Sequence, residues 1–584
     1  MTIRRFAVAL ALVAGAGAVV PAAFASNGRC EQHSTQARCQ APKPAKRRYL
    51  VGAATGSINP PADMIARGDF YLGGYGISSG RLAGRPEAQV IPGRAATGIL
   101  GDGVATRALV VSDGATAVTL AQIDVQGYFA AYKQGPFGIA DIRRHAAARI
   151  AALRAAAGSH AGPEMTAGQI LVDSNHTHGG PDTAGVWGGV PTAYLKLVHD
   201  RTVDAIVTAW QRLRPAEVVF GAVKAGVEGV DPASTDPLTT NQFRTDPNNT
   251  ATDDEVRVIQ ARDADTGAVI VTYVNLSAHA TVLGSSNTLV TGDYTGPLSD
   301  LLAARYGGMG FHQVGTLGRS QPADHDCPTA GLTGAAKDQC RLDAYAARVA
   351  NKVAQALSLA APISADGKPV VSMHSYVVDD AATNAPIFGL AYAGTVVGAP
   401  IYRSVAPPWM VGNALASVTF SGRIGDVLIS GNPGEGYPQI ALAVRDAVAG
   451  ANGIRGYLSV STAGDFLGYL IAPLEAYPEP ARKSLFDGDG VPNDSSCGPA
   501  GCPSPIDNDN YFFNPSHTFG ERVTCSLLRG AGETLGLGSD TFWSRYDRCL
   551  AFTSDHVLAA DYDTTFPEGP DLSGTPAEAA FGGR

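Results

Sequence analysis

The sequence predicts an α/β fold with a mixed β-sheet core and flanking helices, followed by a disulfide-pinned C-terminal region rich in Gly and Asp. Apolar, β-branched runs typical of strands alternate with segments whose apolar residues recur at helical spacing. Some strand-like runs follow one another without an intervening helix, which favours a mixed sheet over a regular parallel one. An apolar fraction of 45% in 584 residues is ample for a sizeable core.

The first half of the chain predicts strands and helices in alternation. The segments are, in chain order, the apolar β-branched run 108–121, the amphipathic helix 139–154, which stops near Gly158, the strand ending at Ser174, the amphipathic helix 194–210 and the strand 217–220.

The second half predicts a hairpin and then further alternation. We expect strands over 256–261 and 269–276 joined at Asp265-Thr266-Gly267, helices over 297–305 and 342–357, a strand over 423–430 and a helix over 440–448.

The first 25 residues have the features of a signal peptide. Arg4 and Arg5 precede the apolar stretch 6–20, and Ala23-Phe24-Ala25 matches the small-x-small pattern of a cleavage site. We therefore expect export with cleavage near Ala25, through an ordinary or a twin-arginine signal, followed by a basic linker over 26–48.

Eight cysteines lie as close neighbours along the chain, which in an exported protein predicts four local disulfides. The spacing does not match the C-x-x-C pattern of metal sites. The expected pairs are Cys30 with Cys39, Cys327 with Cys340, Cys497 with Cys502, and Cys525 with Cys549.

Charge and hydropathy exclude some classes of partner. The net charge is −9 and the only concentrated basic segment is 43–48, which argues against nucleic acid. The uncharged segment 385–402 contains two prolines and three glycines, a poor composition for a membrane span. It predicts buried strand and loop, or alternatively an apolar lip that contacts a lipid-like substrate, with peripheral contact to a membrane or micelle surface.

From about residue 478 to 584 the composition shifts to Gly, Pro, Asp and Cys, which predicts an insertion and C-terminal region packed on the main domain. Within it, Asp487 and Asp489 alternate with Gly488 and Gly490 and are followed by Asp494, in a pattern similar to part of a calcium loop. The segment lacks the full spacing of an EF-hand, so a plain surface loop is the alternative to a Ca²⁺ site.

Three strand-like runs each lead to side chains that bind metals. The run 170–172 leads to His176 and His178, the run 271–276 to His279, and the run 427–429 to Glu435. Ligands gather at strand ends in α/β folds, and two histidines with a carboxylate suit zinc with one position open for water. The alternatives are a polar loop in which His176 and His178 merely cap a strand, a core histidine at His279 bonded to backbone, and a glutamate at a helix N-terminus at Glu435.

These residues belong to a longer series of short motifs: Gly73-Gly74-Tyr75-Gly76, Asn175-His176-Thr177-His178-Gly179-Gly180-Pro181, His279, Gly292-Asp293-Tyr294, residues 315–322, Pro433-Gly434-Glu435 and Tyr469. In this order they resemble the neutral/alkaline, non-lysosomal ceramidase family, and the resemblance covers residues 49–477. It implies a zinc hydrolase domain over that range.

The resemblance also implies roles for individual residues. Zinc would be held by His176, His279, Glu435 and Tyr469, and His178 would line the site and pass protons. Asp293 would fix an imidazole tautomer, or would be an ordinary turn aspartate.

The sequence departs from the family pattern at three places. The family's nucleophilic serine precedes a proline, but here Gln321 precedes Pro322 and Ser320 is one residue away, either a displaced nucleophile or a turn residue. The family's second tyrosine has only Tyr477 and Tyr511 as substitutes. A family histidine is replaced in Gly98-Ile99-Leu100.

We therefore expect an exported zinc-dependent amidohydrolase that cleaves a ceramide-like N-acyl amide through metal-activated water, without need of a serine. The alternatives are an amidase, esterase or lactonase of the same fold, or an exported binding protein without turnover. A calcium-stabilised adhesion protein is a third possibility, suggested only by residues 487–494.

Overall fold

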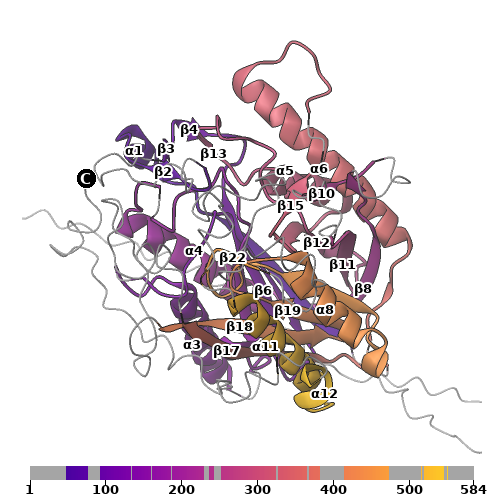
Figure 1. The fold of residues 1–584 in the computed structure, drawn as a ribbon. Coiled ribbons are helices and arrows are strands. Elements are labelled where there is room, and N and C mark those ends of the chain that lie inside the picture. The colour runs from indigo at the N-terminus through magenta and orange to yellow at the C-terminus, as the bar shows by residue number, and fades with distance from the viewer. Residues whose placement is uncertain are drawn as a thin grey trace, which may run out of the picture. The chain divides into compact units, whose positions relative to one another are not determined.

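The computed structural model describes residues 48–75, 93–132, 134–158, 161–185, 187–228, 236–241, 251–323, 326–364, 367–381, 414–471, 515, 518–544 and 549. Two sheets form the core of this part of the chain, and helices cover the outer face of each (Figure 1). The architecture is therefore the mixed α/β arrangement that the sequence predicts.

The larger sheet mixes parallel and antiparallel neighbours. Two parallel pairs, β12 with β14 and β6 with β7, flank an antiparallel centre, and β16 (Ala361–Pro362) adds to β8. Its strand order is β14 (Met309–Val314), β12 (Val269–Leu276), β11 (Glu255–Asp263), β8 (Arg214–Lys224), β1 (Tyr49–Ser57), β5 (Ala105–Ser112), β6 (Ala117–Ile123) and β7 (Ile170–Ser174).

The smaller sheet packs face to face on the larger one. Its order is β17 (Val371–Ala381), β18 (Ala414–Ile424), β19 (Val427–Gly431) and β21 (Gly456–Val460), with β19 and β21 parallel. The apolar core between the sheets is made by residues such as Leu120, Leu171, Ile259, Phe420 and Ile429. This packing brings the ends of β7, β12 and β19 near one another.

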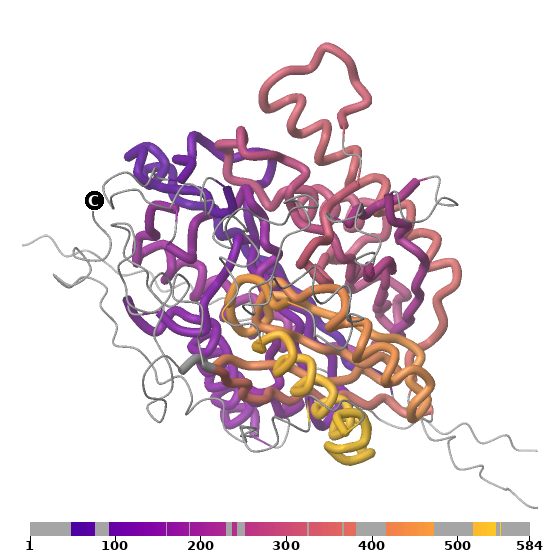
Figure 2. The backbone as a smooth tube through the Cα atoms, in the orientation of Figure 1, coloured from indigo at the N-terminus to yellow at the C-terminus, as the bar shows by residue number. Residues whose placement is uncertain are grey.

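Helices cover the outer faces of both sheets. On the larger sheet, α4 (Thr192–Gln211) packs on β1 and β5 with α3 (Ile139–Ala157) beside it, and α5 (Thr295–Tyr306) and α6 (Gly334–Ser358) pack on β14, β11 and β8. On the smaller sheet, α8 (Pro438–Val448) and α11 (Phe519–Thr534) lie together over β17, β18 and β19, as the tube in Figure 2 shows.

Short elements complete the fold. They are α1 (Ala62–Ala66), α12 (Asp540–Trp543), the 3₁₀ turns η3 (Ala167–Gln169) and η4 (Ala451–Gly453), and the small sheets of β2 (Tyr71–Leu72) with β3 (Arg94–Ala95), β4 (Gly98–Ile99) with β13 (Leu289–Val290), β9 (Val227–Glu228) with β10 (Thr239–Asn241) and β15 (Ser320–Pro322), and β20 (Glu435–Gly436) with β22 (Tyr469–Leu470).

The predicted helices over 139–154, 194–210, 297–305, 342–357 and 440–448 are confirmed as α3, α4, α5, α6 and α8. The hairpin around 265–267 is confirmed as β11 and β12, and the strands 170–174 and 217–220 as β7 and part of β8.

Two predicted strands are each a tight hairpin instead. The run 108–121 turns at Asp113, whose Oδ1 accepts the N–H groups of Ala115 and Thr116, and Gly114, which follows Asp113, has φ +98°. The run 423–430 turns at Gly425, at φ +56°. Both strands of the first hairpin are buried on both faces. No alternation of apolar and polar residues therefore indicates where the run divides into two strands.

Two of the four predicted disulfides are confirmed, Cys327–Cys340 and Cys525–Cys549. The other two predicted pairs lie outside the described residues, as do the segment 385–402 and the aspartates 487, 489 and 494. Within the part of the chain that the structure describes, no helix combines the length and apolar composition needed to cross a bilayer.

Candidate metal centre

His176 follows β7 in a backbone conformation that few residues with side chains adopt, with φ at +59°. The neighbouring Asn175 fixes this turn, because its Nδ2 donates to Asp124 Oδ1 at 2.9 Å and to Thr295 Oγ1 at 2.8 Å. Its Oδ1 accepts the N–H of Thr177 at 3.2 Å. Such over-determined strain is typical of functional sites.

His279 follows β12 and is held by β15. The carbonyl oxygen of Ser320 accepts the backbone N–H of His279 at 3.0 Å and its ring Nδ1 at 2.7 Å. His279 is 2% exposed, so the ring has one orientation within the core.

The partners of the two rings define their tautomers. Nδ1 of His176 lies 2.7 Å from the carbonyl oxygen of Gln126, and Nδ1 of His279 faces the carbonyl of Ser320. A carbonyl oxygen only accepts hydrogen bonds, so Nδ1 carries a proton in both rings, and in the neutral imidazole Nε2 then presents a lone pair. Histidines that bind metals are typically held by such a bond from the other ring nitrogen.

Glu435, in β20, completes the convergence. Its Oε2 lies 3.3 Å from Nε2 of His279 and 3.4 Å from Nε2 of His176. Burial raises the pKa of the Glu435 carboxyl, and the positive charge of protonated imidazoles at His176 and His279 would outweigh it and hold that pKa well below its usual range. With both imidazoles neutral, a carboxylate oxygen and two lone pairs face one another, and a cation between them compensates their repulsion.

The separations suit a metal. Donors bound to one zinc ion at about 2.0–2.1 Å and tetrahedral angles lie about 3.3–3.4 Å apart. This is the spacing that separates Glu435 Oε2 from Nε2 of His176 and of His279.

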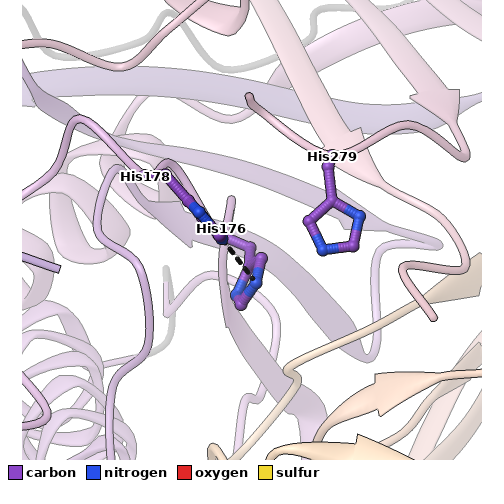
Figure 3. Close-up of side chains that lie close together, drawn as sticks. All are labelled: His176, His178 and His279. Atoms are coloured by element: carbon purple, nitrogen blue, oxygen red, sulfur yellow. Dashed lines mark hydrogen bonds between the residues drawn. The ribbon is translucent and has the colours of Figure 1, made fainter. Parts of the chain in front are cut away.

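His178 belongs to the same cluster. Its Nε2 lies 3.2 Å from Nε2 of His176, and the three imidazoles offer nitrogens that all lie within 4.8 Å of one another, a group that could hold a metal ion. Figure 3 shows His176 and His178 on one loop and His279 on a different segment, on the far side of His176. Burial, and then the neighbouring His176 and His279, hold the pKa of His178 well below its usual range.

Tyr469 lies beside this cluster through its backbone. The parallel strands β20 and β22 pair Glu435 with Tyr469 in register. The fourth residue of the predicted ligand set therefore neighbours the third.

Ser320 contacts the cluster through its main chain. Its Oγ is buried and lies 3.5 Å from Thr316 Oγ1, while the adjacent Gln321 Oε1 accepts the hydroxyl of Thr281 at 2.8 Å. The candidates Tyr477 and Tyr511 lie outside the described residues.

Asp293 holds backbone rather than an imidazole. Its carboxylate oxygens accept the N–H groups of Val282 at 3.0 Å, Leu283 at 2.9 Å and Tyr294 at 2.8 Å. Burial raises the pKa of Asp293 to about 6. Of the two predicted roles, the structure shows the turn aspartate, which fixes the loop after His279.

Three residues near the cluster were not predicted as site residues. The carbonyl of Gln126 fixes His176, and Arg94 and Tyr75 contact the loop or ring of His178. Tyr75 belongs to the glycine-rich motif Gly73-Gly74-Tyr75-Gly76 identified in the sequence, whereas no local pattern identifies Arg94 or Gln126.

Comparison with solved structures identifies proteins of similar fold. A crystal structure of neutral ceramidase from Pseudomonas aeruginosa matches with a TM-score of 0.56 at 14% identity, over 84% of this chain and 75% of that one. A ceramidase complexed with C2 matches with a TM-score of 0.55 at 14% identity, over 84% of this chain and 76% of that one. The resemblance expected from the motifs is thus confirmed at the level of the fold.

No protein-family model matches the sequence, and no curated protein matches it either.

Proposed function

We propose that this protein is an exported zinc-dependent hydrolase that cleaves an N-acyl amide of a ceramide-like lipid. The observation that supports this most directly is the convergence of Glu435 Oε2 on the Nε2 atoms of His176 and His279, at 3.4 and 3.3 Å. The ceramidase fold of the structural neighbours supports the reaction class.

The donor set fits zinc. His176, His279 and Glu435 would hold the ion, together with Tyr469 as the resemblance implies, and imidazole with carboxylate oxygen is a common zinc environment. When bound, zinc lowers the pKa of a coordinated water to about 7 and polarises a carbonyl oxygen.

The chain prepares these ligands in advance. Gln126 and Ser320 fix both imidazoles with Nε2 free of a proton and facing Glu435 Oε2. Little reorganisation is then needed on binding a dication.

His178 is the proposed proton carrier. Nε2 of His176 has one lone pair, which accepts a hydrogen bond from Nε2 of His178 or binds a metal, but not both. With His176 engaged as a ligand, His178 is released to face the substrate. A neutral imidazole can accept a proton from the attacking water and return it to the leaving nitrogen.

The two disulfides support export, because such bonds persist in oxidising compartments. Substitution of the serine position by Gln321 is the observation that favours a second candidate, a binding protein of this fold without turnover.

Zinc analysis and a substrate panel separate the two. We expect the purified protein to contain zinc and to hydrolyse an N-acyl sphingoid base faster than a simple N-acyl amide, an ester or a lactone. His178→Ala should lose turnover while retaining zinc, with the exposed His374→Ala as matched control. Zinc without hydrolysis of any member of the panel would support the binding protein instead.

A further inference from the structure

The loop that carries His178 is bound by a partly buried cationic side chain, Arg94. The Arg94 guanidinium donates to the carbonyl oxygens of His178, of Gly73 at 2.7 Å and of Asn287 at 2.6 Å. Burial lowers the pKa of Arg94 to about 10, which still leaves it charged at neutral pH. Hydrogen bonds from a charged donor are stronger than neutral ones, so three segments of backbone are fixed to one another.

Tyr75 lies between Arg94 and the ring of His178. The ring centroids of Tyr75 and His178 are 4.6 Å apart in a T-shaped arrangement at 72°, and the Arg94 guanidinium carbon lies 4.9 Å from the Tyr75 centroid. The hydroxyl of Tyr75 donates to the carbonyl of Leu283 at 3.3 Å. The phenol is therefore directed at backbone, and its ring packs on the imidazole.

Gly74 allows the close packing on His178. It has φ +94°, and a Cβ at this position would lie 2.3 Å from Cγ of His178. Backbone thus contacts the imidazole directly where any side chain would displace it.

We infer that Arg94 and Tyr75 are positioning residues that fix the imidazole of His178 for proton transfer, an inference that rests on the proposed function. Neither is a catalytic residue, because the hydroxyl of Tyr75 and both terminal nitrogens of Arg94 are bonded to main-chain carbonyls. Displacement of a reacting group by about 1 Å costs roughly a hundredfold in rate, which is the effect these contacts prevent.

The test compares Arg94→Met, Arg94→Lys, Tyr75→Leu and Tyr75→Phe with the wild type. We expect Arg94→Met and Tyr75→Leu to lower kcat about tenfold to a hundredfold with KM nearly unchanged and zinc retained. Tyr75→Phe keeps the ring and should stay near wild type. Arg94→Lys restores a charge and should recover part of the loss. Arg67→Met, at an exposed ion pair with Asp63, is the matched control.

A second measurement does not depend on turnover. The amide of His178 donates to the carbonyl of Ala280 at 3.2 Å, and that of Gly180 to the carbonyl of Thr177 at 3.1 Å. Arg94→Met should accelerate hydrogen exchange of the peptide over 175–182, whereas Arg67→Met should not.

Unchanged kcat and unchanged exchange in both Arg94→Met and Tyr75→Leu would overturn the positioning role. If the wild type hydrolyses nothing but exchange is faster in Arg94→Met, the proposed function fails while the contact of Arg94 with this loop stands. If Arg94→Met does not fold, Arg94→Lys and Tyr75→Leu decide by the same two readouts.

Discussion

The carbonyl oxygen of Ser320 accepts two hydrogen bonds from His279, one from its backbone N–H at 3.0 Å and one from its ring Nδ1 at 2.7 Å. The serine nearest to the family's serine position thus orients a candidate ligand with an atom that every amino acid carries. Its hydroxyl lies 3.5 Å from that of Thr316. Its contribution to the candidate site is therefore independent of its side chain.

Ser320→Ala should retain zinc and keep kcat/KM within about tenfold of the wild type, or about 1.4 kcal/mol, because the main-chain contact survives. Steady-state kinetics with metal analysis measures this, and Thr316→Val is the matched control. Complete loss of hydrolysis with zinc retained would show that Ser320 is the nucleophile.

Asp293→Ala should destabilise the protein and weaken zinc binding. It leaves three buried N–H groups, of Val282, Leu283 and Tyr294, without their acceptors, at about 1–3 kcal/mol each. Because these fix the loop after His279, we expect zinc affinity to fall about tenfold to a hundredfold in chelator competition. Asp293→Asn keeps one acceptor oxygen, so its stability and zinc affinity should lie between those of the wild type and Asp293→Ala. Unchanged zinc affinity in Asp293→Ala would separate this loop from the metal centre.

Asp173 should make stability fall as pH rises. Burial raises its pKa to about 8, although Gln122 and Gln313 donate to its oxygens at 3.0 and 2.6 Å. The pKa of an aspartate in the unfolded chain is about 3.9, so between about pH 4 and pH 8 the folded state holds a proton that the unfolded state has lost. This contribution is complete below about pH 4 and decreases by about 1.4 kcal/mol per pH unit up to about pH 8.

Asp173→Asn removes that proton and should flatten the pH dependence of the unfolding free energy. Urea denaturation at about pH 5 and about pH 8 measures the slope. The exposed Asp265→Asn should leave it unchanged. An identical slope in wild type and Asp173→Asn would show that Asp173 ionises in the folded state as it does in the unfolded chain.

Removal of the Cys525–Cys549 disulfide should cost about 3.5 kcal/mol from the closure of its 24-residue loop, plus the lost burial of both sulfur atoms. The 13-residue loop of Cys327–Cys340 predicts about 2.9 kcal/mol. Thermal unfolding of the two double Cys→Ala variants compares them. A larger fall in Tm on removal of Cys327–Cys340 would contradict the larger contribution expected from Cys525–Cys549.

The sequence was sufficient to predict elements whose apolar residues recur with a clear period. It was insufficient where burial of an element on both faces removes that period. Helix α4 was predicted because its apolar residues lie on one face. Strands β5 and β6 were predicted as one continuous strand, because both faces of each are buried. Helix α11 was missed because the preceding Gly, Pro, Asp and Cys predicted loop, although Phe519, Val523 and Leu527 are buried.

The candidate ligands His176, His279 and Glu435 were predictable because each follows a buried strand. The residues that hold them were not, since Gln126 and Ser320 act through carbonyl oxygens that carry no signature of residue type. Arg94 and Tyr75 lie about a hundred residues from His178 along the chain, and only the folded structure brings them to it.

Zinc content of the purified wild type, His176→Ala, His279→Ala and the control His374→Ala tests the metal centre most directly. We expect one zinc per chain in the wild type and the control, and essentially none in the two site variants, because each removes a nitrogen that faces Glu435. A wild type without zinc, or full zinc occupancy in both His176→Ala and His279→Ala, would contradict the proposed metal centre.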